Sequence, residues 1–61
     1  MYAKYVELRD ARNLTDAKVA EATGISRSTF TDWKNGRSHP KIEKIVKIAK
    51  FFEVSVDELV R

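Results

Sequence analysis

The chain has 61 residues, enough for one small domain spanning residues 1–61, and with no cysteine and one histidine it cannot form a disulfide or a thiolate metal site. Twelve basic and nine acidic residues give a formal net charge of +3, which favours a polyanionic partner without identifying one. No apolar run approaches the length of a membrane span and the N-terminal residues lack a signal-peptide pattern, so we expect a cytoplasmic protein without a membrane partner.

A first helix is predicted over residues 2–12. Its apolar residues Tyr2, Tyr5 and Leu8 recur every three positions and therefore form one stripe along the helix. Asn13 is expected to end this helix, because asparagine adopts the left-handed backbone conformation more readily than most side chains.

A second, slim helix is predicted between Thr15 and Gly24. The Thr15 side chain can cap its first turn, where the carboxylate of Asp16 also suits the helix dipole. Its apolar residues are mostly small, so a neighbouring helix can approach closely; they are Ala17, Val19, Ala20 and Ala22. Gly24 is expected to end the helix, since glycine takes up the left-handed conformation at little cost.

A third helix is predicted from a cap at Ser26 to about Lys34, with residues 35–36 closing it. At about 100° per residue, Phe30 and Trp33 fall on one side of this helix. Large aromatic side chains at helical spacing indicate core packing, so we expect both rings to anchor the helix.

Two further helices are predicted after residues 37–39. Pro40 suits the first turn of the fourth helix. One face of that helix carries Ile42, Ile45, Val46, Ala49 and Phe52, and the other carries Lys41, Lys44, Lys47 and Lys50. The lysines are interpreted as a solvated face that adds a weak positive field. Ser55 and Glu58 form a capping-box pattern that starts a fifth helix ending near Val60, and Val54, Val56 and Leu59 are expected to close the core.

The outward side of the third helix carries short, hydrogen-bonding side chains. Arg27 can bond guanine O6 and N7 in a bidentate manner, and Ser28 and Thr31 can reach base edges or phosphates. Asp32 can accept a hydrogen bond from cytosine N4, although its charge repels phosphates. An ordinary solvated face is the alternative.

The tight turn at residues 24–26 joins this helix to the second one, and a rigid polar helix held in this way suits the major groove of double-stranded DNA. We therefore predict that Arg27, Ser28, Thr31 and Asp32 contact bases.

Contacts to the DNA backbone are predicted beside this face. The free backbone amides around Thr15 and Asp16, at the start of the second helix, can bind a phosphate. The loop with Asn35 and Arg37 offers a second clamp, and Lys34 adds charge beside it. These five residues form the predicted backbone-contacting set.

Taken together, the chain resembles the phage repressor and Cro family of helix-turn-helix regulators. The resemblance covers nearly the whole chain and is carried by Leu8, Arg9, Leu14, Thr15, Val19, Ala20, Gly24, Ile25, Ser26, Ser28, Thr29, Phe30, Trp33, Asn35, Gly36, Pro40, Ala49 and residues 54–59. It implies an all-α, compact, five-helix, lambda-repressor-like domain that binds pseudo-palindromic DNA as a homodimer. It also implies base-reading positions at Arg27, Ser28 and Asp32, and a transcriptional repressor associated with the nucleoid of a bacterial cell or a phage-infected host.

The chain departs from the family pattern near this surface. Relatives often carry glutamine where this chain has Asp16, and a carboxylate cannot donate to a phosphate. They usually carry glutamate at the Lys34 position, paired with an arginine equivalent to Arg9. Here either Lys34 turns toward DNA, or Arg9 finds another acid such as Asp32. Glu53 stands where relatives often have glycine, and a left-handed conformation there costs on the order of 1 kcal/mol.

The favoured interpretation is a dimeric, sequence-specific DNA-binding regulator. The alternative is a protein-interaction module, antitoxin-like, that keeps the fold with weak or no DNA binding; Asp16 and Asp32 motivate it. An enzyme is not expected, because no nucleophile with an adjacent base, metal cluster or nucleotide-binding glycine pattern is visible, and no cofactor, metal or small-molecule ligand is predicted. Phe51 and Val60 are expected to be partly exposed, where they either pair two chains through the last helices or shield the edge of the core.

Overall fold

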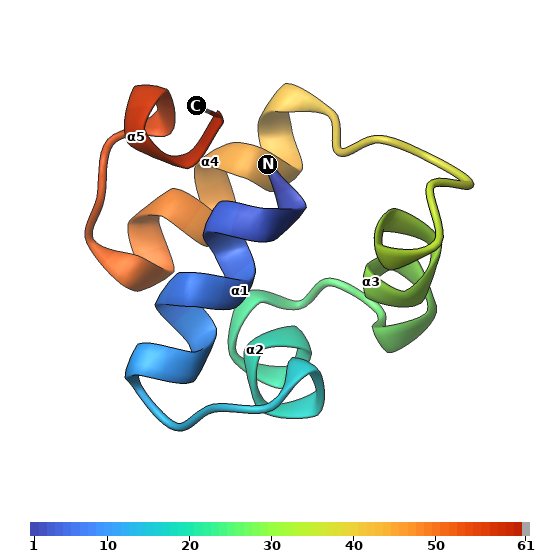
Figure 1. The fold of residues 1–61 in the computed structure, drawn as a ribbon, viewed down its shortest axis with the longest axis horizontal. Coiled ribbons are helices and arrows are strands. Elements are labelled where there is room, and N and C mark those ends of the chain that lie inside the picture. The colour runs from blue at the N-terminus through green and yellow to red at the C-terminus, as the bar shows by residue number, and fades with distance from the viewer. Residues whose placement is uncertain (61) are drawn as a thin grey trace.

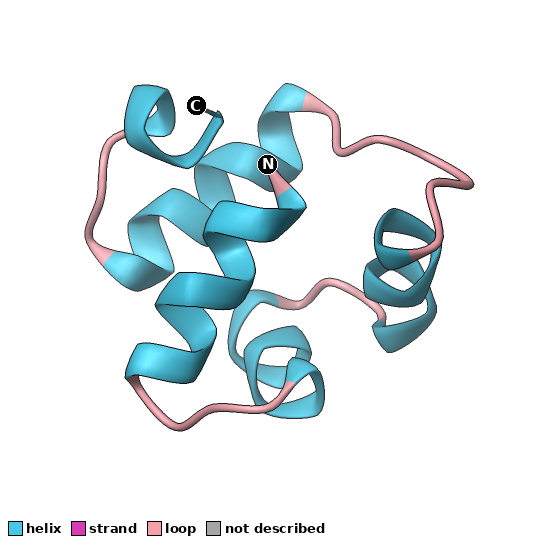
Figure 2. Ribbon diagram, viewed as in Figure 1, coloured by secondary structure: helices cyan, strands magenta, loops and turns pink. Residues whose placement is uncertain are grey.

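The computed structural model describes residues 1–60, which fold into five α-helices joined by short loops (Figure 1). The helices are α1 Tyr2–Ala11, α2 Asp16–Thr23, α3 Arg27–Lys34, α4 Ile42–Phe52 and α5 Val56–Val60. Figure 2 shows no strand among the described residues, so the predicted all-α, five-helix fold is confirmed. None of the helices described is long and apolar enough to cross a membrane.

The helix ends follow local capping chemistry. The side-chain oxygens of Thr15, Ser26 and Ser55 each accept a hydrogen bond from the backbone N–H three residues later, at 3.1, 3.3 and 3.1 Å. Gly24 ends α2 at φ 76°, and Asn13 follows α1 at φ 55°. The predicted caps and left-handed stops are therefore confirmed at these five positions.

The first helix ends one residue earlier than the sequence predicts. Arg12 is the C-cap of α1, at φ −103°, and its Nη2 donates to the backbone carbonyl oxygen of Phe52 at 2.8 Å. The backbone carbonyl at the end of α4, which has no partner within its own helix, is satisfied in this way.

The fourth helix begins later than the sequence predicts. Pro40 is predicted in its first turn, but α4 starts at Ile42, with Lys41 as its N-cap in an extended conformation at φ −82°, ψ 161°. Extended residues advance about 3.3 Å each, more than twice the rise of a helix, so residues 38–41 can span the gap between α3 and α4 that Figure 1 shows.

The buried face of α4 is also rotated from the prediction. Ile48 is fully buried, whereas Ile42, predicted on the apolar face, is 64% exposed. The buried stripe runs through Ile48, Ala49 and Phe52, with Ile45 partly buried behind it. A chain of this size fills only a small core, and Ile42, in the first turn of α4, lies beyond the edge of that core.

Aromatic rings form the centre of the core. Tyr5 and Phe30 have no exposed surface and Phe52 has 1%, and the Tyr5 ring centroid lies 5.2 Å from that of Phe30 and 6.1 Å from that of Phe52. Trp33 is 7% exposed and meets Phe30 edge-on, with the ring centroids 5.0 Å apart. The predicted anchoring of α3 by Phe30 and Trp33 is therefore confirmed. The rest of the buried core consists of Val19, Ala20, Ile25, Ile48, Ala49 and Leu59.

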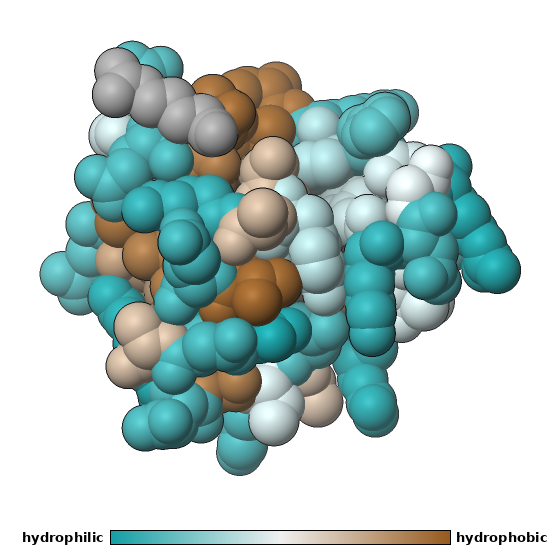
Figure 3. Space-filling model, in the orientation of Figure 1, coloured by the Kyte–Doolittle hydropathy of each residue, from teal (hydrophilic) through white to brown (hydrophobic). Residues whose placement is uncertain are grey.

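The surface is largely hydrophilic. Figure 3 shows hydrophilic residues over much of one face, with apolar residues at its upper edge and in smaller groups toward its centre and lower left. Val60 is 46% exposed and Phe51 is half-buried, with its ring centroid 4.9 Å from that of Phe52. The predicted partial exposure of Phe51 and Val60 is thus confirmed.

Replacing Glu53 by glycine is expected to stabilise the protein. Glu53 follows α4 in a left-handed conformation, at φ 57° and ψ 42°, which a side chain disfavours. We expect Glu53→Gly to raise the free energy of unfolding by about 0.5–1 kcal/mol in urea denaturation. Asn13→Gly is the matched control: Asn13 has φ 55°, but asparagine tolerates this conformation, so its gain should be smaller. An unchanged or lower stability of Glu53→Gly would show that this position is not strained.

Candidate nucleic-acid interface

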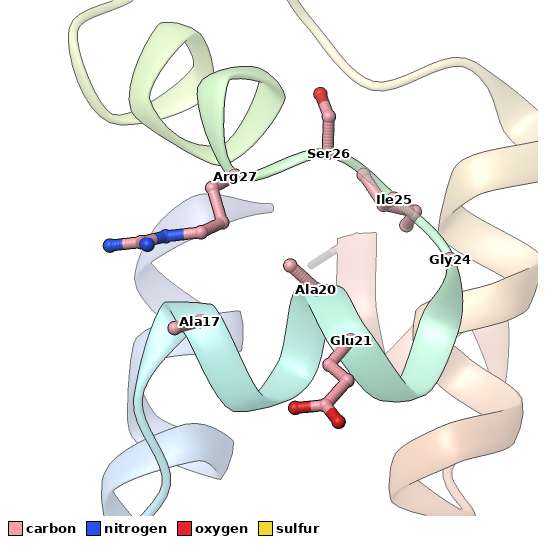
Figure 4. A pocket seen from close by; sticks show the side chains of 7 residues that line it. All are labelled: Ala17, Ala20, Glu21, Gly24, Ile25, Ser26 and Arg27. Carbon is pink, nitrogen blue, oxygen red and sulfur yellow. The ribbon is translucent and has the colours of Figure 1, made fainter.

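The second and third helices are joined by the tight turn at residues 24–26. Ile25 is 2% exposed and inserts into the core, which fixes the turn to the body of the domain. Figure 4 shows Arg27 at the start of α3 extending over the start of α2 toward Ala17, while Glu21 projects from α2 in a different direction. An open hollow of about 560 Å³ lies between the two helices, with the small residues Ala17 and Ala20 in its wall. The two helices therefore form one rigid, accessible unit.

The third helix has one buried and one solvent-facing side. Phe30 and Trp33 face the core, whereas Arg27, Ser28 and Thr31 are exposed. Successive members of the outward set lie one helical turn apart, in the pairs Arg27 with Thr31 and Ser28 with Asp32, so they form two neighbouring rows. The four residues predicted to contact bases thus lie together on the outward side of α3.

The outward side chains differ in how much of their hydrogen-bonding capacity the protein already uses. Within residues 1–60 the Arg27 guanidinium has no hydrogen-bond or ion-pair partner, so its donors face solvent. Thr31 Oγ1 donates to the carbonyl oxygen of Arg27 at 3.3 Å, which occupies the hydroxyl proton and leaves the methyl group for apolar contact. Ser28 Oγ lies 3.2 Å from Ser26 Oγ, in the cap of the same helix.

Asp32 is held near an arginine from the following loop. The backbone N–H of Arg37 donates to the carbonyl oxygen of Asp32 at 2.9 Å, and Arg37 Nη1 lies 3.8 Å from Asp32 Oδ1. Both side chains are exposed, at 71% and 44%, so this ion pair is weak and either group is available to another partner.

The partner of Arg9 is on α2 and not on α3. The sequence leaves two alternatives: Lys34 turns toward DNA, or Arg9 pairs with another acid such as Asp32. Arg9 does pair with another acid, but this acid is not Asp32. Arg9 Nη1 donates to Asp16 Oδ1 at 2.9 Å, and its Nη2 lies 2.9 Å from Asp10 Oδ1. The reason is geometric: Asp16 begins α2 beside α1, whereas Asp32 lies on the outward side of α3 next to Arg37.

The hydroxyl of Tyr5 binds the same carboxylate, a contact that the sequence does not predict. Tyr5 Oη donates to Asp16 Oδ1 at 2.5 Å. Burial raises the pKa of Asp16, but the hydrogen bonds from Tyr5 and Arg9 outweigh it, with a smaller contribution from the charge of Lys34, so that pKa lies below its ordinary value. Burial and the bond to Asp16 raise the pKa of Tyr5 well above its ordinary value. The signal available in the sequence was that a buried tyrosine hydroxyl needs a partner.

The residues predicted to contact the DNA backbone lie at two helix ends. Thr15 and Asp16 are at the start of α2, where Thr15 is exposed and its hydroxyl caps the helix. Lys34, Asn35 and Arg37 are exposed at the end of α3, where Asn35 is the C-cap. Gly36 next to them has φ 72°, as a tight turn at this point requires. No group of three or more metal-ligating side chains occurs in the described part of the chain.

Comparison with known proteins agrees with this geometry. A model of the helix-turn-helix family matches residues 7–59. The chain is 39% identical over 56 residues to the HTH-type transcriptional activator BcrR of Enterococcus faecalis, covering 92% of this chain and 28% of that protein. It is 36% identical over 58 residues to the cryptic phage CTXphi transcriptional repressor RstR of Vibrio cholerae, covering 95% of this chain and 52% of that protein.

A similar match extends to an archaeal protein. The HTH-type transcriptional regulator MJ0272 of Methanocaldococcus jannaschii is 35% identical over 51 residues, covering 84% of this chain and 77% of that protein. The chain spans only 28% and 52% of the lengths of BcrR and RstR, so what is shared with these two is a domain. The chain belongs to the helix-turn-helix family, of the Cro and phage-repressor type.

Proposed function

We propose that this chain binds double-stranded DNA in a sequence-specific manner, with α3 in the major groove, and that it acts as a transcriptional repressor. The observation that carries the proposal is the outward side of α3, which presents short polar side chains while Phe30 and Trp33 hold its other side in the core. Residues 1–61 are treated as one domain, because the five helices share one core. The proposal includes no catalytic step and no cofactor, and it places the protein with the nucleoid in the cytoplasm.

We assign roles to the outward side chains from their chemistry. Arg27, which has no partner within the described chain, bonds guanine O6 and N7. Thr31 presents its methyl group to a thymine methyl, because its hydroxyl proton is donated to the backbone. Asp32 accepts from cytosine N4, and Ser28 contacts a base edge beside it. Each role is specific to one base type, so each is open to a separate test.

Phosphate contacts are assigned to the exposed residues at the two helix ends. Lys34, Asn35 and Arg37 approach the backbone from the end of α3, and Thr15 does so from the start of α2. Asp16, at the first position of α2, lies next to the phosphate contact proposed for Thr15. Arginine and lysine contacts of this kind make affinity fall steeply as salt rises.

We also propose that two copies bind a pseudo-palindromic site. One α3 of eight residues reads only a few base pairs, and a two-fold dimer doubles the site and its specificity. Val60 on α5 is 46% exposed and Phe51 is half-buried, and exposed apolar side chains are what a pairing surface needs. Sedimentation with and without DNA tests the stoichiometry.

The alternative of a protein-interaction module is motivated by two carboxylates near the DNA-facing side. In this fold Asp16 has Arg9 as a partner at 2.9 Å, and Asp32 has Arg37 at 3.8 Å. Each negative charge is partly offset by a neighbouring arginine, closely for Asp16 and weakly for Asp32, which supports DNA binding over the alternative. A protein without affinity for any duplex at low salt would favour the alternative.

Selection of bound duplexes from a random pool, repeated at two salt concentrations, tests the proposed function. The expected result is a two-fold symmetric motif with half-sites about one helical turn apart. The absence of an enriched motif, with weak binding that vanishes at moderate salt, would contradict sequence-specific binding and leave only a basic surface.

Replacing Arg27 by alanine is expected to weaken binding to the selected site by about 1–3 kcal/mol and to relax the preference at one base pair. The measurement is repeated selection together with titration of the wild-type site. Lys50→Ala is the control, because it removes the same charge from the lysine face of α4 and should weaken all duplexes slightly and equally. Equal losses on every duplex for Arg27→Ala would remove Arg27 from the base-reading set.

Replacing Asp32 by alanine is expected to have two opposite effects. Preference at one base pair should relax, while affinity for unrelated duplexes should rise by about twofold to threefold at low salt, because a negative charge beside the phosphates is lost. Glu58→Gln on α5 removes the same charge far from α3 in sequence and serves as the control. Unchanged base preference in Asp32→Ala would show that Asp32 reads no base.

A further inference from the structure

The first residue of α2 carries a carboxylate that the protein itself already ligates. Asp16 Oδ1 accepts from Tyr5 Oη at 2.5 Å and from Arg9 Nη1 at 2.9 Å. Tyr5 is completely buried, while the side chains of Arg9 and Asp16 are 20% and 33% exposed. One oxygen of Asp16 is therefore held from the α1 side, and part of the carboxylate still faces solvent.

This arrangement places a fixed negative charge at a helix end that would otherwise attract anions. The free N–H groups and the dipole at the start of a helix favour a phosphate. Asp16 is the first residue of α2, so its carboxylate adds a negative charge at this helix end, and it stays ionised because its hydrogen bonds hold its pKa below the ordinary value. A DNA phosphate approaching this end of α2 meets a like charge, offset only in part by Arg9 and Lys34.

We propose that Asp16 is a positioning residue with a second effect on DNA: it ties α2 to α1, and its charge lowers the affinity of the start of α2 for a phosphate. Asp16 thus borders the DNA backbone without bonding it, and the favourable backbone contacts lie on Thr15 and at the end of α3. This inference rests on the proposed DNA-binding function and refines the role of one residue in that surface.

Asp10 provides a matched control for the charge. It also pairs with Arg9, at 2.9 Å from Nη2 and 3.0 Å from Nε, but it lies on α1 and its side chain is 62% exposed. Asp10→Asn and Asp16→Asn remove the same net charge and disturb the same arginine. Only Asp16→Asn removes the charge from the start of α2.

Tyr5 provides a second control, which disturbs the structure around Asp16 without removing the charge of its carboxylate. Tyr5→Phe removes the hydroxyl bond to Asp16 and keeps the carboxylate. If Asp16 acts on DNA through its charge, Tyr5→Phe should lower the urea midpoint of unfolding and leave the DNA affinity of the folded protein unchanged. Asp16→Ala is a further neutral variant, which adds no hydrogen-bond donor, in case Asp16→Asn folds poorly.

The experiment measures fluorescence anisotropy of a labelled, mixed-sequence duplex of about 20 base pairs, long enough for two half-sites. Each variant is titrated at low and at high salt, after circular dichroism has shown that it is folded. Asp16→Asn or Asp16→Ala is expected to bind about threefold more tightly than wild type at low salt, with the gain shrinking as salt rises. Asp10→Asn should gain less.

Three results would overturn the inference alone. They are equal gains for Asp16→Asn and Asp10→Asn, a gain for Tyr5→Phe as large as that for Asp16→Asn, and no gain in either neutral variant at position 16. Failure of the folded wild-type protein to bind the duplex at low salt is a different outcome, since it would overturn the proposed function and this inference together.

Discussion

The packing of one side chain, Tyr5, connects most of this small fold. Its ring meets Phe30 of α3 and Phe52 of α4, and its hydroxyl donates to Asp16 at the start of α2. A domain of this length buries few side chains, so a single side chain that contacts three other helices carries a large share of their mutual orientation. The helix that faces outward is thus positioned by a residue on a helix that never reaches that surface.

The outward side of α3 depends on the same core. A helix of eight residues is too short to be stable alone, and α3 is helical because Phe30 and Trp33 fasten it to the bundle and Ser26 caps it. Because tertiary packing supplies this stability, the remaining positions are free to carry short polar side chains. The outward residues can therefore change in chemistry without loss of the fold.

The features that the sequence predicts correctly are those that depend on neighbours a few residues away. Caps at Thr15 and Ser26 and the left-handed Asn13 and Gly24 follow from local hydrogen bonding and backbone sterics. Pro40 and Ile42 are misplaced because the length of the loop before α4, and the edge of the core that α4 reaches, depend on where α3 packs. The partner of Arg9 is likewise not predictable from spacing, since several acids lie within reach until α1 and α2 are packed. The outward set on α3 is predictable as a surface, but its contacts to DNA are not.

The charges at positions 16 and 34 each suit the dipole of the helix end at which they lie. From the resemblance, we expect an acid at the end of the third helix to pair with the arginine of the first. Here the acid that binds Arg9 is Asp16, at the start of α2, where a helix dipole favours a negative charge. Lys34 lies in the last turn of α3, where the dipole favours a positive charge. Arg9 therefore keeps a carboxylate partner, both helix ends carry the charge that suits them, and an exposed lysine stands beside the outward helix where an acid would repel phosphates.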